Sequence, residues 1–326
     1  MIIGIDTDQP FNSRHFTAPR TDGQRGTRWD AFQEWLRGNP AFAGRYFNSN
    51  AAGVFRPGEA RAVKQMSGGK LTRIVPIQGA PFRRYRESTQ ELGVNVRQGQ
   101  FQRGFDVGAR EALRTCDGIW AAWELEPLRL PESSEVMVYL DVEGGTRLSP
   151  HYWAGWASTV YNYSFLHQAA ALPSVSPLSN APLLPAMYCR FEQGADNLYY
   201  PERLIRDCLN SAPILWPQHH TFCYGFWSSH PEPCRLCVAP FAFRPNESSF
   251  GLFGTYQQPR ANGQTSQVPV TLWQFAESEG CQNPERNPRG CCQPAQNAFA
   301  ARLNLDMDAA NDQPGVDATQ YMLVIP

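Results

Sequence analysis

Short apolar runs alternate along the chain with segments in which apolar residues recur every three or four positions. Such runs are typical of buried strands, and the recurrent spacing is typical of helices that pack on one face. The strands predicted in this way span residues 2–6, 42–47, 71–78, 135–143, 184–189, 219–227, 268–275 and 302–306. The helices predicted between them span residues 29–36, 57–66, 105–113, 150–168 and 201–209.

This regular alternation predicts an α/β protein, specifically a (β/α)₈ TIM-like barrel with strands inside and helices outside. No internal repeat and no shift in composition divides the chain. We therefore expect a single barrel domain over residues 1–326, with long loop insertions near residues 79–103 and 228–267.

Composition and charge exclude several classes of protein. Hydrophobic residues make up 42% of the 326 residues, which excludes a disordered or fibrous chain. The net charge of -1 gives no basic footprint, so we expect no nucleic-acid partner. No apolar stretch approaches the roughly 18–20 residues of a membrane span, so none is expected. Composition does not predict the oligomeric state.

The first residues do not have the pattern of a secretory signal peptide. The segment 1–6 carries no basic residue and reaches Asp6 at once, which is typical of a buried strand. Unless a signal peptide has been removed, we therefore expect the protein either to remain in the cytoplasm or to act outside the cell or on the cell wall by a non-classical route. Cell lysis, a phage particle or an injection system would each provide such a route.

Four acidic residues lie at the ends of predicted strands: Asp6, Asp141, Glu143 and Asp306. Catalytic groups of parallel barrels sit at the carboxyl ends of strands. Asp141 and Glu143 are separated by one residue, so in a strand both side chains point to the same face. Such a pair can divide the roles of general acid and charge stabiliser. The alternative is that both residues only begin a solvated loop and cap the next helix.

The same strand ends carry motifs that resemble family 25 glycoside hydrolases, which are lysozyme-type muramidases with a (β/α)₈-like barrel. These motifs are Gly4-Ile5-Asp6, Tyr139-Leu140-Asp141-Val142-Glu143, Leu272-Trp273-Gln274-Phe275 and Leu305-Asp306-Met307-Asp308. Three further segments, Gly44-Arg45-Tyr46, Val75-Pro76-Ile77 and the helix from Asp106 to Leu113, look closer to a related group of bacterial glycoside-hydrolase-like domains.

The resemblance implies a role for each acid. Glu143 would protonate the glycosidic oxygen, and Asp141 would orient the substrate's own 2-acetamido group as it attacks the anomeric carbon. Asp6 and Asp306 would hold this pair in place. Asp308 competes with Asp306 for the last position, and Asp306 is preferred because it ends the apolar run.

Residues at or near strand ends are the expected substrate contacts. They are Tyr46, Gln78, Tyr188, Trp227, Trp273 and Gln274. Aromatic faces at such positions can stack on sugar rings, and plain core packing is the alternative for each ring. His151 follows the catalytic strand and could reach the cleft, or it is simply solvated at the start of a helix.

Two functions follow as hypotheses. The first is a glycoside hydrolase that cleaves peptidoglycan or a related N-acetylated glycan, without metal or cofactor. The alternative is a non-catalytic barrel that binds cell-wall glycan as a component of a phage or secretion-related particle.

Cysteines are numerous, and six of the nine fall between residues 223 and 292. In an oxidising environment we expect Cys223, Cys234, Cys237, Cys281, Cys291 and Cys292 to form disulfides that tie long loops to the barrel. Zinc binding with His219, His220 and His230 and ordinary thiols are the alternatives. Cys116 and Cys189 are expected to be buried thiols.

Overall fold

The computed structural model describes most of the chain, with gaps. The described residues are 2–21, 23–48, 53–79, 98–126, 128–142, 148–170, 181–189, 200–211, 223–229, 255–259, 265–276, 303, 305–312 and 316–326. The strands are β1 (Ile2–Thr7), β2 (Phe42–Asn48), β3 (Arg73–Gln78), β4 (Val136–Asp141), β5 (Leu183–Cys189), β6 (Phe226–Ser229), β7 (Thr255–Pro259), β8 (Thr265–Ala276), β9 (Asp306–Ala310) and β10 (Leu323–Val324). The helices are α1 (Arg14–Thr17), α2 (Arg28–Leu36), α3 (Glu59–Met66), α4 (Gln98–Leu125), α5 (Pro150–Ala170), α6 (Tyr200–Ser211) and the 3₁₀ helix η6 (Ala318–Tyr321).

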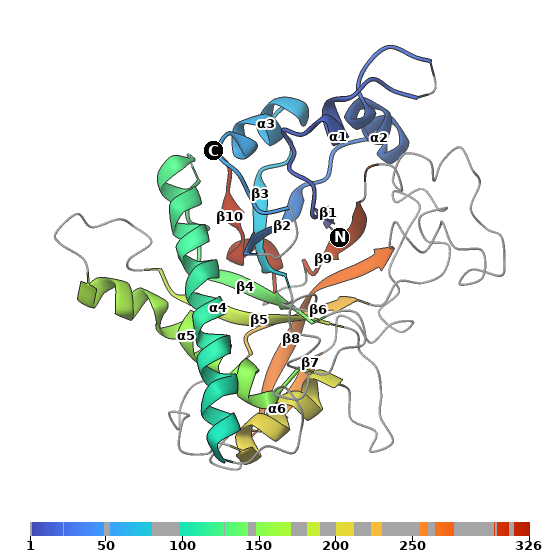
Figure 1. The fold of residues 1–326 in the computed structure, drawn as a ribbon. Coiled ribbons are helices and arrows are strands. Elements are labelled where there is room, and N and C mark those ends of the chain that lie inside the picture. Colours follow the sequence, from blue (N-terminus) through green and yellow to red (C-terminus); the bar gives the residue numbers. More distant parts are fainter. Residues whose placement is uncertain are drawn as a thin grey trace.

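The strands form a closed barrel (Figure 1), as the alternating pattern predicted. Its order is β3-β2-β1-β9-β8-β6-β5-β4, and pairing of β4 with β3 closes the ring. The seven barrel strands other than β9 run parallel to one another, whereas β9 is antiparallel to both of its neighbours, β1 and β8. Two strands lie outside the ring: β7 pairs with β8, and β10 pairs with β3.

The last barrel strand differs from its prediction. The sequence pattern predicted a strand over 302–306 with Asp306 at its carboxyl end, but Asp306 is the first residue of β9. The prediction was wrong because Leu303 and Leu305 supplied the apolar pattern while the strand itself carries two aspartates. Since β9 is antiparallel, its first residue nevertheless lies level with the carboxyl ends of the other strands.

The boundaries of helix α4 and strand β6 also differ from the predicted ones. Helix α4 has 28 residues and extends the predicted helix 105–113 in both directions. Its second half repeats the helical spacing with the buried residues Cys116, Ile119 and Ala122. Strand β6 begins at Phe226, whereas the prediction began at residue 219, which lies outside the described residues. Within the part of the chain that the structure describes, no helix is long and apolar enough to cross a membrane.

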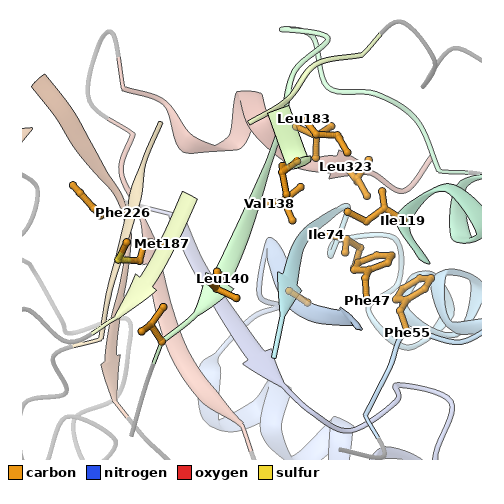
Figure 2. Packing of buried hydrophobic residues seen from close by; sticks show 14 of the residues in the cluster. Phe47, Phe55, Ile74, Ile119, Val138, Leu140, Leu183, Met187, Phe226 and Leu323 are labelled. Carbon is orange, nitrogen blue, oxygen red and sulfur yellow. The ribbon is translucent and has the colours of Figure 1, made fainter. Parts of the chain in front are cut away.

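Buried apolar side chains form two layers, one on each face of the barrel wall. Val136, Val138 and Leu140 of β4 point outward into the larger cluster, which fills the space between barrel and helices (Figure 2). Met137 and Tyr139 alternate with them and point into the barrel interior. A parallel strand buried on both faces requires such a continuous apolar run, which explains why the pattern identified β4 so clearly.

A glycine makes room for the largest interior side chain. Gly44 on β2 faces the interior, and a Cβ atom there would lie 2.6 Å from Cη2 of Trp227 and 2.8 Å from Cβ of Asp6. Real Cβ atoms do not approach other atoms this closely. The absence of a side chain at Gly44 therefore allows the Trp227 indole to cross the barrel.

Helices α4 and α5 cross at very short distance. A Cβ on Gly155 of α5 would lie 2.1 Å from the carbonyl oxygen of Phe105, and a Cβ on Gly108 of α4 would lie 2.1 Å from that of Tyr152. The two glycines bring the helix backbones into direct contact. Both helices also contact the barrel wall, α4 at β2 and β3 and α5 at β5.

The C-terminal segment closes the end of the barrel opposite the carboxyl ends of its parallel strands. Ala318 and Met322 are buried in the interior cluster. Strand β10 pairs with the first residues of β3. The Arg73 guanidinium donates a hydrogen bond of 3.0 Å to the Thr319 carbonyl oxygen. The segment 316–326 is therefore the floor of the barrel.

The described cysteines are buried and form no disulfide: Cys116, Cys189, Cys208 and Cys223. The prediction for Cys116 and Cys189 is confirmed. The prediction that Cys223 forms a disulfide was wrong, because its thiol is enclosed in the core and donates to the Gly225 carbonyl oxygen over 3.2 Å. Burial raises the pKa of the Cys223 thiol well above its ordinary value. Cys234, Cys237, Cys281, Cys291 and Cys292, with His219, His220 and His230, lie outside the described residues.

Candidate functional site

Polar and aromatic side chains gather inside the barrel near the carboxyl ends of its parallel strands. Strand side chains alternate between the two faces, so every second residue points inward. The inward residues nearest this end form a group that we name the mouth cluster. Its members are Asp6, Tyr46, Asp141, Tyr188, Trp227, Gln274, Asp306 and Asp308.

Asp6 lies at the centre of the mouth cluster. It is 4% exposed, and its Oδ2 accepts a hydrogen bond of 3.2 Å from the Tyr188 hydroxyl across the barrel. On the neighbouring strand β9, Asp306 lies directly opposite Asp6. Directly opposite residues of an antiparallel pair point to the same face with Cβ atoms about 4.5–5.5 Å apart. The structure therefore brings these two predicted acids together.

Asp141 ends β4 on the same face. It is partly exposed, and its Oδ2 accepts a hydrogen bond of 3.1 Å from the Tyr46 hydroxyl of β2. Tyr188 lies directly opposite Asp141 on β5, so Asp141 and Asp6 share a neighbour. Glu143, two residues further along, lies outside the described residues.

The two aspartates of β9 are both in the mouth cluster. Gln274 donates from Nε2 to Oδ2 of Asp306 over 2.8 Å. Trp227 donates from Nε1 to Oδ1 of Asp308 over 3.1 Å. Asp306 is partly exposed, whereas Asp308 is completely buried. Both alternatives for the last acid therefore point inward, with Asp306 nearer the rim.

Trp227 and Tyr188 form the base of the mouth cluster. Their rings stack with centroids 4.5 Å apart, and Tyr139 meets Trp227 edge-on at 5.4 Å. Trp227 is completely buried and Tyr188 is 1% exposed. In this conformation their faces pack on one another, so core packing describes them better than the predicted stacking on sugar. Tyr46 is the partly exposed aromatic residue of the mouth cluster.

Two predicted substrate contacts point away from the mouth. Ile77 and Gln274 face the interior, so their neighbours Gln78 and Trp273 face the outer layer. Both are completely buried there. Their positions differ from the predicted ones, because successive strand residues point to opposite faces, and the inward side chains of Ile77 and Gln274 put Gln78 and Trp273 on the outer face.

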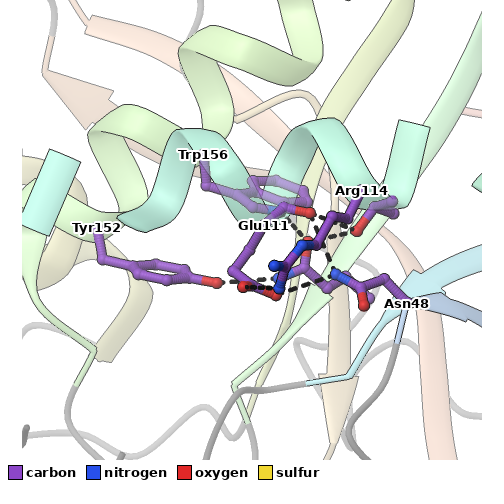
Figure 3. A network of polar contacts seen from close by, with 7 residues as sticks. Asn48, Glu111, Arg114, Tyr152 and Trp156 are labelled. Atoms are coloured by element: carbon purple, nitrogen blue, oxygen red, sulfur yellow. Dashed lines mark hydrogen bonds and ion pairs between the residues drawn. The ribbon is translucent and has the colours of Figure 1, made fainter. Parts of the chain in front are cut away.

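Gln78 instead belongs to a polar network beneath α4 and α5, part of which Figure 3 shows. Its Nε2 donates to the Tyr152 hydroxyl over 2.9 Å, and its Oε1 accepts from Trp156 Nε1 over 2.6 Å. The Thr115 hydroxyl donates to the same oxygen over 2.6 Å. This side chain joins the end of β3 to both helices.

We expect Gln78→Leu to lower the free energy of unfolding by about 2 kcal/mol or more, since a buried donor without an acceptor costs roughly 1–3 kcal/mol. Trp156 and Thr115 would both lose their acceptor at Gln78. Urea denaturation measures this loss. The exposed Gln65→Leu on α3 is the matched control and is expected to change stability by less than about 0.5 kcal/mol. Equal stability of the two variants would show that the network contributes nothing.

A buried ion pair lies just outside the mouth and was not predicted. The Arg45 guanidinium donates from Nε to Oε1 of Glu59 over 2.5 Å, and both side chains are completely buried. Arg45 also donates to the carbonyl oxygens of Thr7 and Gly53. It therefore fixes the chain where β1 leaves the barrel, directly after Asp6.

The described residues contain no group of three side chains suited to hold a metal ion. His151 lies in the first turn of α5, where its Cβ would be 3.1 Å from a Cβ on Gly104 of α4. Burial lowers the pKa of His151. Its place at the helix crossing differs from the predicted approach to the cleft.

Comparison with known proteins adds little to this geometry. Neither a family model nor a curated protein matches the chain. The chain is similar to an uncharacterized B. stearothermophilus protein of known crystal structure, with 14% identity and a TM-score of 0.49. The similarity covers 99% of this chain and 100% of that one.

Proposed function

We propose that the protein is a retaining glycosidase that cleaves peptidoglycan or a related N-acetylated glycan. The observation that carries this proposal is the mouth cluster, in which Asp6, Asp141 and Asp306 from three strands lie at one end of the barrel. This is the end at which barrel enzymes place their catalytic groups. Carboxyl groups held together in this way suit the oxocarbenium-like transition state of glycoside cleavage.

In the proposed reaction Glu143 donates a proton to the glycosidic oxygen as the bond to the anomeric carbon breaks. The carbonyl oxygen of the substrate's 2-acetamido group attacks the anomeric carbon from the opposite side. Asp141 faces the acetamido N–H and stabilises the positive charge that develops there. Water then opens the cyclic intermediate, Glu143 recovers its proton from that water, and the configuration at the anomeric carbon is retained.

The contacts of Asp141 support this role. The Tyr46 hydroxyl donates to one of its oxygens, which fixes the plane of the carboxylate at the end of β4. A preoriented carboxylate stabilises developing charge without reorganising during the reaction. Asp6, which is buried, and Asp306, which is partly exposed, add negative charge to the same mouth.

The test is release of reducing ends from purified peptidoglycan. Glu143→Gln is expected to reduce the rate by roughly 10²–10⁴-fold, the usual contribution of a general acid. Because the acetamido group takes part, chemically de-N-acetylated glycan is expected to resist cleavage by the wild type. NMR of the first product should show retained anomeric configuration.

Glu132→Gln is the matched control, since Glu132 is exposed and precedes the other end of β4. It should cleave at the wild-type rate. Rates equal in wild type and Glu143→Gln would contradict the proposal. Binding to cell walls without any product from the wild type would also contradict it and would favour a glycan-binding barrel.

A further inference from the structure

Within the described residues, the side-chain amide oxygen of Gln274 in the mouth cluster has no hydrogen-bond donor. The Gln274 side chain is completely buried, and its Nε2 donates to Asp306 over 2.8 Å. Its Oε1 is also buried but accepts no hydrogen bond within the described structure. The contact with Asp306 fixes which end of the amide is the oxygen, since a carboxylate accepts and does not donate. A donor for Oε1 is therefore required.

The residue directly opposite Gln274 is Asp308 on β9. Directly opposite residues of an antiparallel pair share a face, with Cβ atoms about 4.5–5.5 Å apart, which is within reach of a hydrogen bond between their side chains. Asp308 is completely buried, and its Oδ1 accepts from Trp227 Nε1. In its protonated form this carboxyl group has one O–H to donate.

The groups around Asp308 favour the protonated form. On its own strand the next inward residue is Asp306, and Asp6 lies opposite Asp306 on β1. Gly4 of β1 lies opposite Asp308 itself, β6 contributes the neutral Trp227, and β8 contributes the neutral Gln274. Three carboxyl groups thus lie close together, and of these Asp6 and Asp308 are buried while Asp306 is partly exposed. Burial and like charge both disfavour a third ionised carboxylate there.

We propose that Asp308 is protonated at neutral pH and donates its O–H to Oε1 of Gln274. The hydrogen bonds then run in one direction, from Asp308 to Gln274 and from Gln274 to Asp306. Trp227 continues to donate to the other oxygen of Asp308. Asp308 is thus a positioning residue that orients the amide toward an ionised Asp306. The inference concerns the geometry of the mouth and holds whether or not the barrel cleaves glycan.

A protonated Asp308 makes stability depend on pH with a defined sign. The unfolded chain releases this proton above about pH 4, while the folded protein retains it. The folded state then binds more protons than the unfolded state, so stability falls as the pH rises. The proton on Asp308 then makes the unfolding equilibrium constant rise about tenfold for each pH unit.

Asp308→Asn tests the proposal, because its Nδ2 can donate to Gln274 while its Oδ1 accepts from Trp227. The variant should fold and match the wild type near pH 4. Between roughly pH 4 and pH 7 its unfolding equilibrium constant should fall about tenfold per pH unit relative to the wild type. Asp312→Asn is the matched control, since Asp312 is exposed just beyond β9, and should show no such trend.

The proposal would be overturned if the ratio of the unfolding equilibrium constants of Asp308→Asn and wild type did not change with pH. It would also be overturned if the variant were destabilised or unfolded at neutral pH. A second measurement needs no variant to fold. In wild-type protein with ¹³C-labelled aspartate carboxyl groups, one resonance should keep the chemical shift of a protonated carboxyl through neutral pH. The absence of such a resonance would equally overturn the proposal.

Discussion

Arg45→Met is expected to lower the free energy of unfolding by roughly 3–5 kcal/mol, the cost of breaking a buried ion pair. The substitution leaves the Glu59 carboxylate completely buried without its cation. It also removes the donors to the carbonyl oxygens of Thr7 and Gly53. Denaturant unfolding followed by tryptophan fluorescence measures the change.

The double variant Arg45→Met/Glu59→Leu should recover much of this loss, because two apolar side chains leave no buried charge. Arg61→Met is the matched control, since Arg61 is an exposed arginine on α3, and should change stability by less than about 0.5 kcal/mol. If the single and double variants are equally unstable, the loss comes from the carbonyl contacts of Arg45 rather than from the ion pair.

Trp227→Ala is expected to lower the free energy of unfolding by a similar amount, roughly 3–5 kcal/mol, because it leaves a cavity in the middle of the barrel. The indole fills the space above Gly44, stacks on Tyr188 and donates to Asp308. Trp227→Phe is the informative comparison. It keeps most of the ring contact but loses the N–H that donates to Asp308, and we expect it to lower the free energy of unfolding by about 2 kcal/mol.

Urea denaturation of both variants separates the two contributions. A clear difference between Trp227→Ala and Trp227→Phe measures the packing of the indole. Equal losses would show that the hydrogen bond to Asp308 accounts for the whole effect, contrary to the cavity argument.

The sequence predicted the barrel because its strands are buried on both faces. In β4 and β5 nearly every residue is apolar, and such runs are hard to mistake. Strand β9 was predicted too early in the chain because two of its five residues are aspartates, which are normally found outside a core. A search for apolar runs does not recognise a strand whose inward face carries acidic side chains.

The candidate site was predicted in part for the same reason. Asp6, Asp141 and Asp306 were identified from their positions at strand ends, and the structure brings them to one mouth. Gln78 and Trp273 were misplaced because closeness to a strand end was given more weight than the face of the strand. The partners of each acid come from other strands, and a single sequence does not show contacts across a barrel.

The reversal of β9 has a consequence for how this fold can diversify. The connection from Ala276 to Asp306 leaves and re-enters the barrel at the same rim, so its length is not constrained by the height of the barrel. Lengthening such a segment costs only about 0.6 kcal/mol per doubling. The chain then leaves β9 at the opposite end, where residues 316–326 close the floor. Evolution can therefore remodel the rim by insertion while the floor, and with it the integrity of the barrel, stays unchanged.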